Sequence, residues 1–245
     1  MPAPTYRATV ERIDSLSYNV RGVRLKLVEP RELRFDAGQF VILHVPKDGQ
    51  IVKRAYSIAS APQDPTAIEL CVQHIERGAA STYFWQLKEG DPIAFSGPHG
   101  TFALKQPLDY EPVFMATGTG VAPLRSMIRH LLHTNFLKDA WLFFGTRYEH
   151  ALLYESEFRS ISGARRNFHY VPTVSRPKEW HGEVGHIQQT FQKHITDYRN
   201  KEIYLCGWLA VIQAICRDLE ALGVPREKLH YEEWADHHAP APSGS

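Results

Sequence analysis

The stretch Met115-Ala116-Thr117-Gly118-Thr119-Gly120-Val121-Ala122-Pro123 runs from an apolar segment through two glycines into an amphipathic segment. Glycines permit a tight turn and a close approach of the backbone to a phosphate, whose charge the free amides and the following helix dipole stabilise. Pro123 fits the first helical turn, where a missing amide costs nothing. The pattern G-x-G-x-x-P therefore predicts a strand, a phosphate-binding turn and a helix, with an ordinary strand-to-helix connection as the alternative.

In the rest of the second half, apolar runs alternate with segments of helical periodicity. Apolar runs stand at 113–116, 140–144, 168–174 and 202–206, and apolar residues recur at helical spacing within 121–133 and 212–222. This rhythm predicts a parallel sheet with crossover helices, a Rossmann-like domain.

The first half has a different pattern. Six short apolar or alternating runs, separated by Pro, Gly and Asp, predict six strands of an antiparallel barrel: 6–13, 19–28, 40–45, 56–60, 68–75 and 91–97. A turn is expected at 97–102. We place the first domain at 1–108, the second at 109–236 and a disordered tail at 237–245, because the chain is Pro-flanked and polar near Asp109.

Composition excludes several classes of protein. Lys and Arg number 28 and Asp and Glu 27, which gives no general attraction to nucleic acid or anionic lipid. No apolar run is long enough to span a membrane and the first residues do not resemble a secretory signal, so we expect a cytoplasmic protein. We also expect a monomer.

Three scattered cysteines are too few for an iron–sulfur cluster held by these residues alone. No metal site is expected, because His130 and His133 lie beside an ordinary helix and His237 and His238 in the tail.

Two motifs in the first half point to a bound anion with a planar ring. In Arg54-Ala55-Tyr56-Ser57 the arginine suits a phosphate and the tyrosine ring suits stacking on a planar cofactor. Gly78-Ala79-Ala80-Ser81 predicts a helix start whose amides face an anion and which Ser81 caps. A plain capped helix is the alternative for the second motif.

Taken together, the motifs RAYS, GAAS, GPHGTF and GTGVAP and the pair Cys206-Gly207 stand in an order and spacing that resembles the ferredoxin–NADP reductase superfamily. The resemblance spans about residues 6–234. It implies a six-stranded Greek-key FAD-binding barrel followed by an NAD(P)-binding domain, with hydride passing from NAD(P)H to the flavin where the domains meet.

The resemblance also implies the flavin site. Arg54 would bind the FAD pyrophosphate, Tyr56 would stack on the isoalloxazine ring, and Ser57 would lie near its N5 atom. The presence of both RAYS and GAAS favours FAD over FMN. The FAD-binding residues so implied are Arg54, Ala55, Tyr56, Ser57, Gly78, Ala79, Ala80, Ser81 and Trp234.

The nucleotide site is implied in the same way. Its residues would be Thr117, Gly118, Thr119, Gly120, Pro123, Thr146, Arg147, Ser175, Arg176, Cys206 and Gly207. The implied catalytic residues are Ser57, Cys206 and Glu232. Cys206 would lie where the nicotinamide docks, although a small buried thiol at a strand end is the alternative. The run Leu229–Trp234 resembles the family's closing strand, in which Trp234 would cover the flavin unless it simply closes a core strand.

The choice between NADPH and NADH rests on the adenosine ribose. Arg147 and Arg176, with Thr146 and Ser175, suit a 2′-phosphate and slightly favour NADPH. The tract Trp180–Gly185, however, resembles NADH-linked reductases that serve oxygenases.

The resulting hypothesis is an FAD-dependent NAD(P)H reductase that passes electrons to ferredoxin or flavodoxin. The alternatives are the reductase component of an oxygenase, a reductase of free flavins, and a flavin-binding subunit without catalytic activity that responds to redox state.

Overall fold

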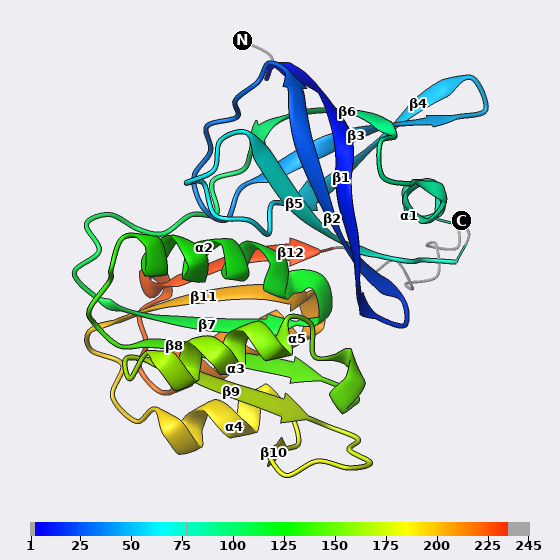
Figure 1. Ribbon diagram of the computed structural model, residues 1–245. Coiled ribbons are helices and arrows are strands. Elements are labelled where there is room, and N and C mark those ends of the chain that lie inside the picture. Colours follow the sequence, from blue (N-terminus) through cyan, green and yellow to red (C-terminus); the bar gives the residue numbers. More distant parts are fainter. Residues whose placement is uncertain (1–2, 77, 235–245) are drawn as a thin grey trace, which may run out of the picture.

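The alternating runs of the first half form one antiparallel sheet in the computed structural model, which describes residues 3–76 and 78–234. In space the strands follow the order β4-β3-β6-β1-β2-β5. A bridge between Ile58 and Leu70 joins the two edges, so the sheet closes into a barrel, the upper domain of Figure 1. The predicted antiparallel barrel is confirmed. The strands are β1 (Thr5–Ser17), β2 (Val20–Glu29), β3 (Phe40–Lys47), β4 (Gln50–Ser57), β5 (Ala67–Gln73) and β6 (Pro92–His99).

One short helix covers the end of the barrel next to β4. Helix α1 (Ala79–Gln86) contributes Phe84, which is fully buried. The Phe84 ring lies 5.4 Å from the ring of Tyr56, centroid to centroid. This contact packs Tyr56 against α1, the helix that lies next to β4 in Figure 1.

The second half forms a parallel sheet in the order β10-β9-β8-β7-β11-β12. Apolar side chains of its central strands face both ways, with α2 and α3 on one face and α4 and α5 on the other. This confirms the predicted parallel sheet with crossover helices. The elements are β7 (Glu111–Thr117), η1 (Gly118–Gly120), α2 (Val121–His133), β8 (Ala140–Thr146), η2 (Glu149–Ala151), α3 (Glu155–Ala164), β9 (Phe168–Val174), β10 (Glu183–Val184), α4 (Ile187–His194), β11 (Lys201–Trp208), α5 (Leu209–Ala221), η3 (Arg226–Lys228) and β12 (Leu229–Trp234).

Two local expectations are wrong. The strand expected at 56–60 is β4, which begins at Gln50 and ends at Ser57. Because β4 is an edge strand that pairs along its length only with β3, its first residues are largely exposed and do not alternate between apolar and polar. The turn expected at 97–102 begins later, because β6 continues to His99 before Gly100 adopts a φ of 90°.

The apolar core runs across the two domains. One cluster of buried residues combines Ala59, Cys71 and Phe102 from the barrel side with Phe114 and Val121 from the second domain. The proposed boundary at 108–109 falls in the connection between β6 and β7. A shared core of this kind holds the two domains in one relative position.

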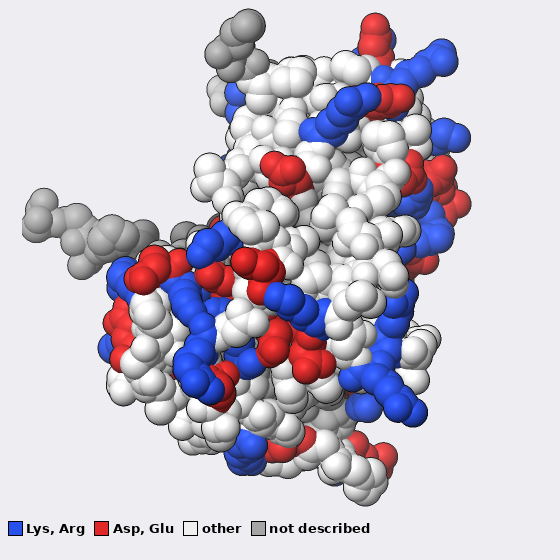
Figure 2. Space-filling view, turned by 90° about the vertical axis from the view of Figure 1, so that its left-hand side faces the viewer, with Lys and Arg blue, Asp and Glu red and all other residues white. Residues whose placement is uncertain are grey.

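Charge on the visible surface is mixed. The face of the molecule that lies on the left in Figure 1 carries both signs, interleaved over the lower domain (Figure 2). Every helix within residues 3–76 and 78–234 is too short or too polar to cross a membrane.

Candidate functional site

The three residues expected to act in catalysis come together at the junction of the domains. Cys206 and Glu232 are direct register partners on the paired strands β11 and β12. The Ser57 hydroxyl, at the end of β4, donates a hydrogen bond of 3.3 Å to Oε2 of Glu232. Ser57 and Cys206 are buried. A pair of residues 175 positions apart in the sequence thus meets across the domain boundary.

Glu232 lies at an open hollow between the domains. Gly100, Thr101 and Phe102 line it from the barrel side, and residues 230–232 of β12 line it from the other. Burial raises the pKa of the Glu232 carboxyl to about 7, and the hydrogen bond from Ser57 only partly opposes that rise. Glu232 therefore changes its charge near neutral pH, as suits a group that holds and releases a proton.

The segment expected to bind the flavin offers a free cation beside an aromatic ring. Arg54 is exposed, and its guanidinium donates to the carbonyl of Lys53 at 2.8 Å while meeting no carboxylate among the described residues. Ala55 is exposed next to it. Tyr56 is half-buried, and burial raises its pKa to about 12 although the charge of Arg54 opposes this, so its ring stays neutral.

The start of α1 leaves backbone donors for an anion. Gly78 is the N-cap and no side chain caps the helix, so the amides of the first turn lack a side-chain acceptor. The expectation that Ser81 caps α1 is wrong. Its hydroxyl is buried, donates to the carbonyls of Ile75 and Gly78 and accepts from the amide of Ile75, so it stabilises the loop before the helix. Ala80 is also buried.

Together these groups fit an FAD pyrophosphate and ring. Arg54 supplies a positive charge, the amides of α1 supply donors at a positive helix end, and Tyr56 supplies a flat apolar surface. When FAD is bound, Arg54 and the residues 78–81 would hold its diphosphate.

The glycine turn between β7 and α2 serves two purposes. Gly118 has a φ of 55°, and an added Cβ there would meet nothing within 4 Å, so this side of the turn is open to a ligand. A Cβ at Gly120 would lie 2.3 Å from the carbonyl oxygen of Cys206. A Cβ at Gly207 would lie 2.1 Å from Oγ1 of Thr117. The end of β11 can approach β7 and the turn after it this closely only with glycine at positions 120 and 207.

Sequence reasoning did not anticipate this packing role for Gly120 and Gly207. The family resemblance assigns both residues to nucleotide binding, and no local pattern reveals that their segments touch. Pro123 is buried in the first turn of α2, where its missing amide has no cost. Thr119 lies between the two glycines of η1.

The four residues expected near the adenosine ribose lie together. The Ser175 amide donates to the Thr146 carbonyl at 3.0 Å, and the Arg176 amide donates to the Arg147 carbonyl at 2.8 Å. Both arginine side chains are exposed. The ends of β8 and β9 thus carry two exposed arginines on adjoining backbone segments, which suits a phosphate monoester.

Two tryptophans end the strands β11 and β12. Trp208, which sequence reasoning missed, is 57% exposed, and its amide donates to Oγ1 of Thr117 at 3.1 Å. It is the register partner of Trp234. The Trp234 side chain lies outside the described part of the structure, so its expected position over the flavin stays a prediction.

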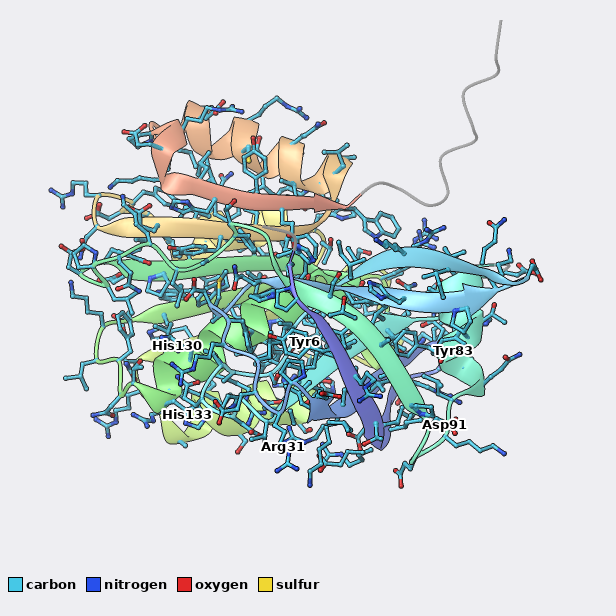
Figure 3. The ribbon with its side chains drawn as sticks, turned by 90° about the horizontal axis from the view of Figure 1, so that it is seen from above. Tyr6, Arg31, Tyr83, Asp91, His130 and His133 are labelled. Atoms are coloured by element: carbon cyan, nitrogen blue, oxygen red, sulfur yellow. The ribbon has the colours of Figure 1, made fainter. Side chains whose placement is uncertain are left out.

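The histidines of α2 lie away from this site. Figure 3 shows His130 and His133 at the opposite end of the molecule from Tyr83 of α1. A hydrogen bond of 2.7 Å joins His130 Nδ1 to the Gln63 side chain. In the described part of the chain no three His, Cys, Asp or Glu side chains gather as metal ligands. His237 and His238 lie outside it.

Comparison with known proteins agrees with the two-domain fold. Residues 7–104 match the family model of the oxidoreductase FAD-binding domain, and residues 114–217 match that of the oxidoreductase NAD-binding domain. Ferredoxin–NADP reductase B of Sorangium cellulosum is 34% identical over 95% of this chain and 98% of that protein. Phenol hydroxylase P5 protein of Acinetobacter pittii is also 34% identical, over 94% of this chain, which spans 65% of that longer relative.

Solved structures share the fold. The Amycolatopsis cytochrome P450 reductase GcoB superposes with a TM-score of 0.86 at 28% identity, over 95% of this chain and 70% of that one. The ferredoxin–NADP reductase of Neisseria gonorrhoeae superposes with a TM-score of 0.82 at 20% identity, over 94% and 99% of the two chains. With its FAD-binding barrel, its NAD-binding sheet and its close relative of nearly equal length, the chain belongs to the ferredoxin–NADP reductase family of FAD- and NAD(P)-dependent oxidoreductases.

Proposed function

We propose that this protein takes hydride from NADPH onto FAD and passes the electrons to ferredoxin or flavodoxin. The observation that carries the proposal is the meeting of Ser57, Cys206 and Glu232 from the two domains. Similarity to a ferredoxin–NADP reductase over 98% of that relative's length supports the acceptor. The three cysteines of these 245 residues are too few for an iron–sulfur cluster held by them alone, so the acceptor that we propose is a separate molecule.

Positioning is the main contribution of the protein to this reaction. FAD, when bound, supplies the hydride-accepting chemistry itself. Arg54 and the start of α1 hold the diphosphate, and Tyr56 orients the ring. Cys206 shapes the nicotinamide pocket, and the Ser57–Glu232 pair holds a proton near the flavin edge. Hydride transfer then depends on bringing the two rings into contact.

Substitution of the buried pocket residues tests these roles. We expect Ser57→Ala and Cys206→Ala each to lower the rate of flavin reduction about tenfold, because a positioned group in a transfer site is worth at least that much. FAD should stay bound, since neither side chain holds the diphosphate. Stopped-flow reduction by NADPH measures the rate, and Cys216→Ala, a buried thiol on α5, is the matched control. Unchanged reduction in both pocket variants would contradict the assignment.

The preference for NADPH rests on Arg147 and Arg176. Both are exposed beside the backbone pair that joins the ends of β8 and β9. Two guanidinium groups bind a 2′-phosphate in bidentate fashion, whereas the ribose hydroxyl of NADH does not use them.

A second candidate is the reductase component of an oxygenase. Phenol hydroxylase P5 protein is as similar in sequence as the ferredoxin–NADP reductase, at 34% identity. Such a protein would favour NADH. The location in the cytoplasm and the monomeric state remain predictions from the sequence.

An anaerobic absorbance titration of the purified protein with NADPH and, separately, with NADH distinguishes these functions. Bleaching of the flavin band at low NADPH supports the proposal, and bleaching by NADH alone favours the oxygenase reductase. A yellow protein that neither nucleotide bleaches is a flavin-binding subunit without this activity. A protein that loses its flavin on purification but reduces added flavin is a free-flavin reductase.

A further inference from the structure

Two polar residues lie buried on α2, directly after the nucleotide turn. Arg125 is 4% exposed and Ser126 is fully buried, although the surrounding cluster is apolar. A buried guanidinium is costly unless its donors are all used. The roles assigned so far to the turn at 118–120 do not require either side chain.

Arg125 connects the two domains. Its Nη1 donates to the Ala59 carbonyl at 2.9 Å and lies 3.1 Å from Oε1 of Glu69, both in the first domain. Its Nε donates to Oε2 of Glu157 at 2.8 Å, and its guanidinium lies 4.1 Å from the ring centre of Tyr154, both in the second domain. The planar fork of arginine makes these contacts in fixed directions.

Ser126 adds a second connection to the same segment. Its hydroxyl donates to the Ser60 carbonyl at 2.6 Å. Ser60 in turn accepts from the Glu69 amide at 3.0 Å, and the Ala59 amide donates to the Glu69 carbonyl at 2.7 Å. The backbone at 59–60 is therefore held from α2 on one side and from β5 on the other. We call Arg125, Ser126, Ala59, Ser60 and Glu69 the interdomain clamp.

In each domain, the residues of the clamp lie a few positions along the chain from residues of the candidate site. Ala59 follows Ser57, the partner of Glu232, by two residues, and Arg125 follows Gly120 of the nucleotide turn by five. The end of β4, which carries the residues on the flavin side, is thereby held against α2, the helix that begins at the nucleotide turn. Movement of α2 against residues 59–60 would change the separation of the two sites.

An apolar contact would hold the domains together at lower cost. A buried ion pair contributes little stability relative to packed apolar side chains, because its charges lose their water, but its hydrogen bonds fix direction and distance. The clamp is surrounded by such apolar packing already. Its distinctive contribution is therefore orientation.

We propose, on the basis of the function proposed above, that Arg125 and Ser126 are positioning residues, which set the separation of the nicotinamide and flavin rings for hydride transfer without touching either. Hydride transfer needs reacting atoms about 3–3.5 Å apart, and a displacement of about 1 Å costs on the order of 100-fold in rate. A small change at the clamp is thus expected to slow the transfer while each nucleotide still binds.

The test uses Arg125→Lys and Ser126→Ala in the FAD-loaded protein. Lysine keeps the charge between Glu69 and Glu157 but cannot form the several directed bonds of the fork. Arg129→Lys is the matched control, because Arg129 lies one turn further along α2 and pairs at 3.3 Å with Glu157, in its own domain. Stopped-flow reduction by NADPH gives a rate constant, which reports ring geometry, and an amplitude, which reports the fraction of folded enzyme.

We expect the rate constant to fall about tenfold in Arg125→Lys and less in Ser126→Ala, since a partial displacement costs less than the full 1 Å. The amplitude, the FAD content and the nucleotide dissociation constant should match those of the wild type. The deuterium isotope effect with 4-deuterated NADPH should not fall, because the substitutions are expected to slow hydride transfer itself. Arg129→Lys should behave as the wild type.

Unchanged rate constants in both variants, with or without loss of amplitude, would overturn the proposal and leave the clamp a support of stability only. If Arg125→Lys does not fold, the rate constant of Ser126→Ala decides by the same criterion. Should NADPH fail to reduce the wild type, the same comparison is made with NADH, so the choice of nucleotide is separate from the role of the clamp.

Discussion

Replacing Gly120 with alanine is expected to weaken NADPH binding severely while FAD stays bound. The added Cβ would lie 2.3 Å from the carbonyl oxygen of Cys206 and 2.5 Å from its carbonyl carbon. Both are backbone atoms, which cannot rotate away as a side chain can. The turn that follows β7 must therefore move away from the end of β11, and this turn is the one expected to bind the nucleotide. Such overpacking costs about 1–3 kcal/mol, so the dissociation constant for NADPH should rise up to about 100-fold.

Gly163→Ala is the matched control. Gly163 lies within α3, and an added Cβ there meets nothing within 4 Å. Alanine stabilises the interior of a helix by about 1 kcal/mol relative to glycine, so this variant should bind NADPH normally and melt no lower than the wild type. Nucleotide titrations and thermal unfolding of both variants measure the effect. Normal NADPH binding by Gly120→Ala would mean that the turn can move without cost.

Glu232→Gln is expected to stabilise the protein at alkaline pH. In the folded chain burial raises the pKa of Glu232 from its ordinary 4.5 to about 7. Below pH 4.5 the carboxyl is protonated in both states and costs nothing. Between these values the unfolded chain ionises first, so the folded state loses stability as pH rises, and the full loss is present above pH 7.

Glutamine removes that loss because it does not ionise. We expect the gain in unfolding free energy to be about 2 kcal/mol larger at pH 8 than at pH 5, after allowance for the partial exposure of the group. Urea unfolding of the FAD-loaded protein at the two pH values measures it. Ser57→Ala should act in the opposite direction, since its hydroxyl bond favours the ionised carboxylate. Equal pH profiles for Glu232→Gln and the wild type would contradict the expectation.

Local patterns were enough for the central elements. The apolar spacing within 121–133 marks α2 residue for residue, and the glycines at 118 and 120 mark the turn before it, since a buried helix face and a tight turn each leave a short-range signal. The edge strand β4 gave only a weak short-range signal in the sequence. Its residues 50–53 are mostly exposed, so they needed no apolar alternation.

Composition and periodicity thus determined the two-domain plan, because apolar periodicity is a local property of each segment. The motif resemblance determined the cofactors. Three properties were decided only in three dimensions. Glu232 has a raised pKa because it is buried where the two domains meet, and the hydrogen bond from Ser57 only partly opposes that rise. Gly120 leaves no room for a Cβ because the backbone of Cys206, far away in the sequence, touches it. In the sequence, Arg125 cannot be told apart from an ordinary polar residue of a helix. Its burial and its contacts with Ala59 and Glu69 depend on segments that lie far apart in the sequence.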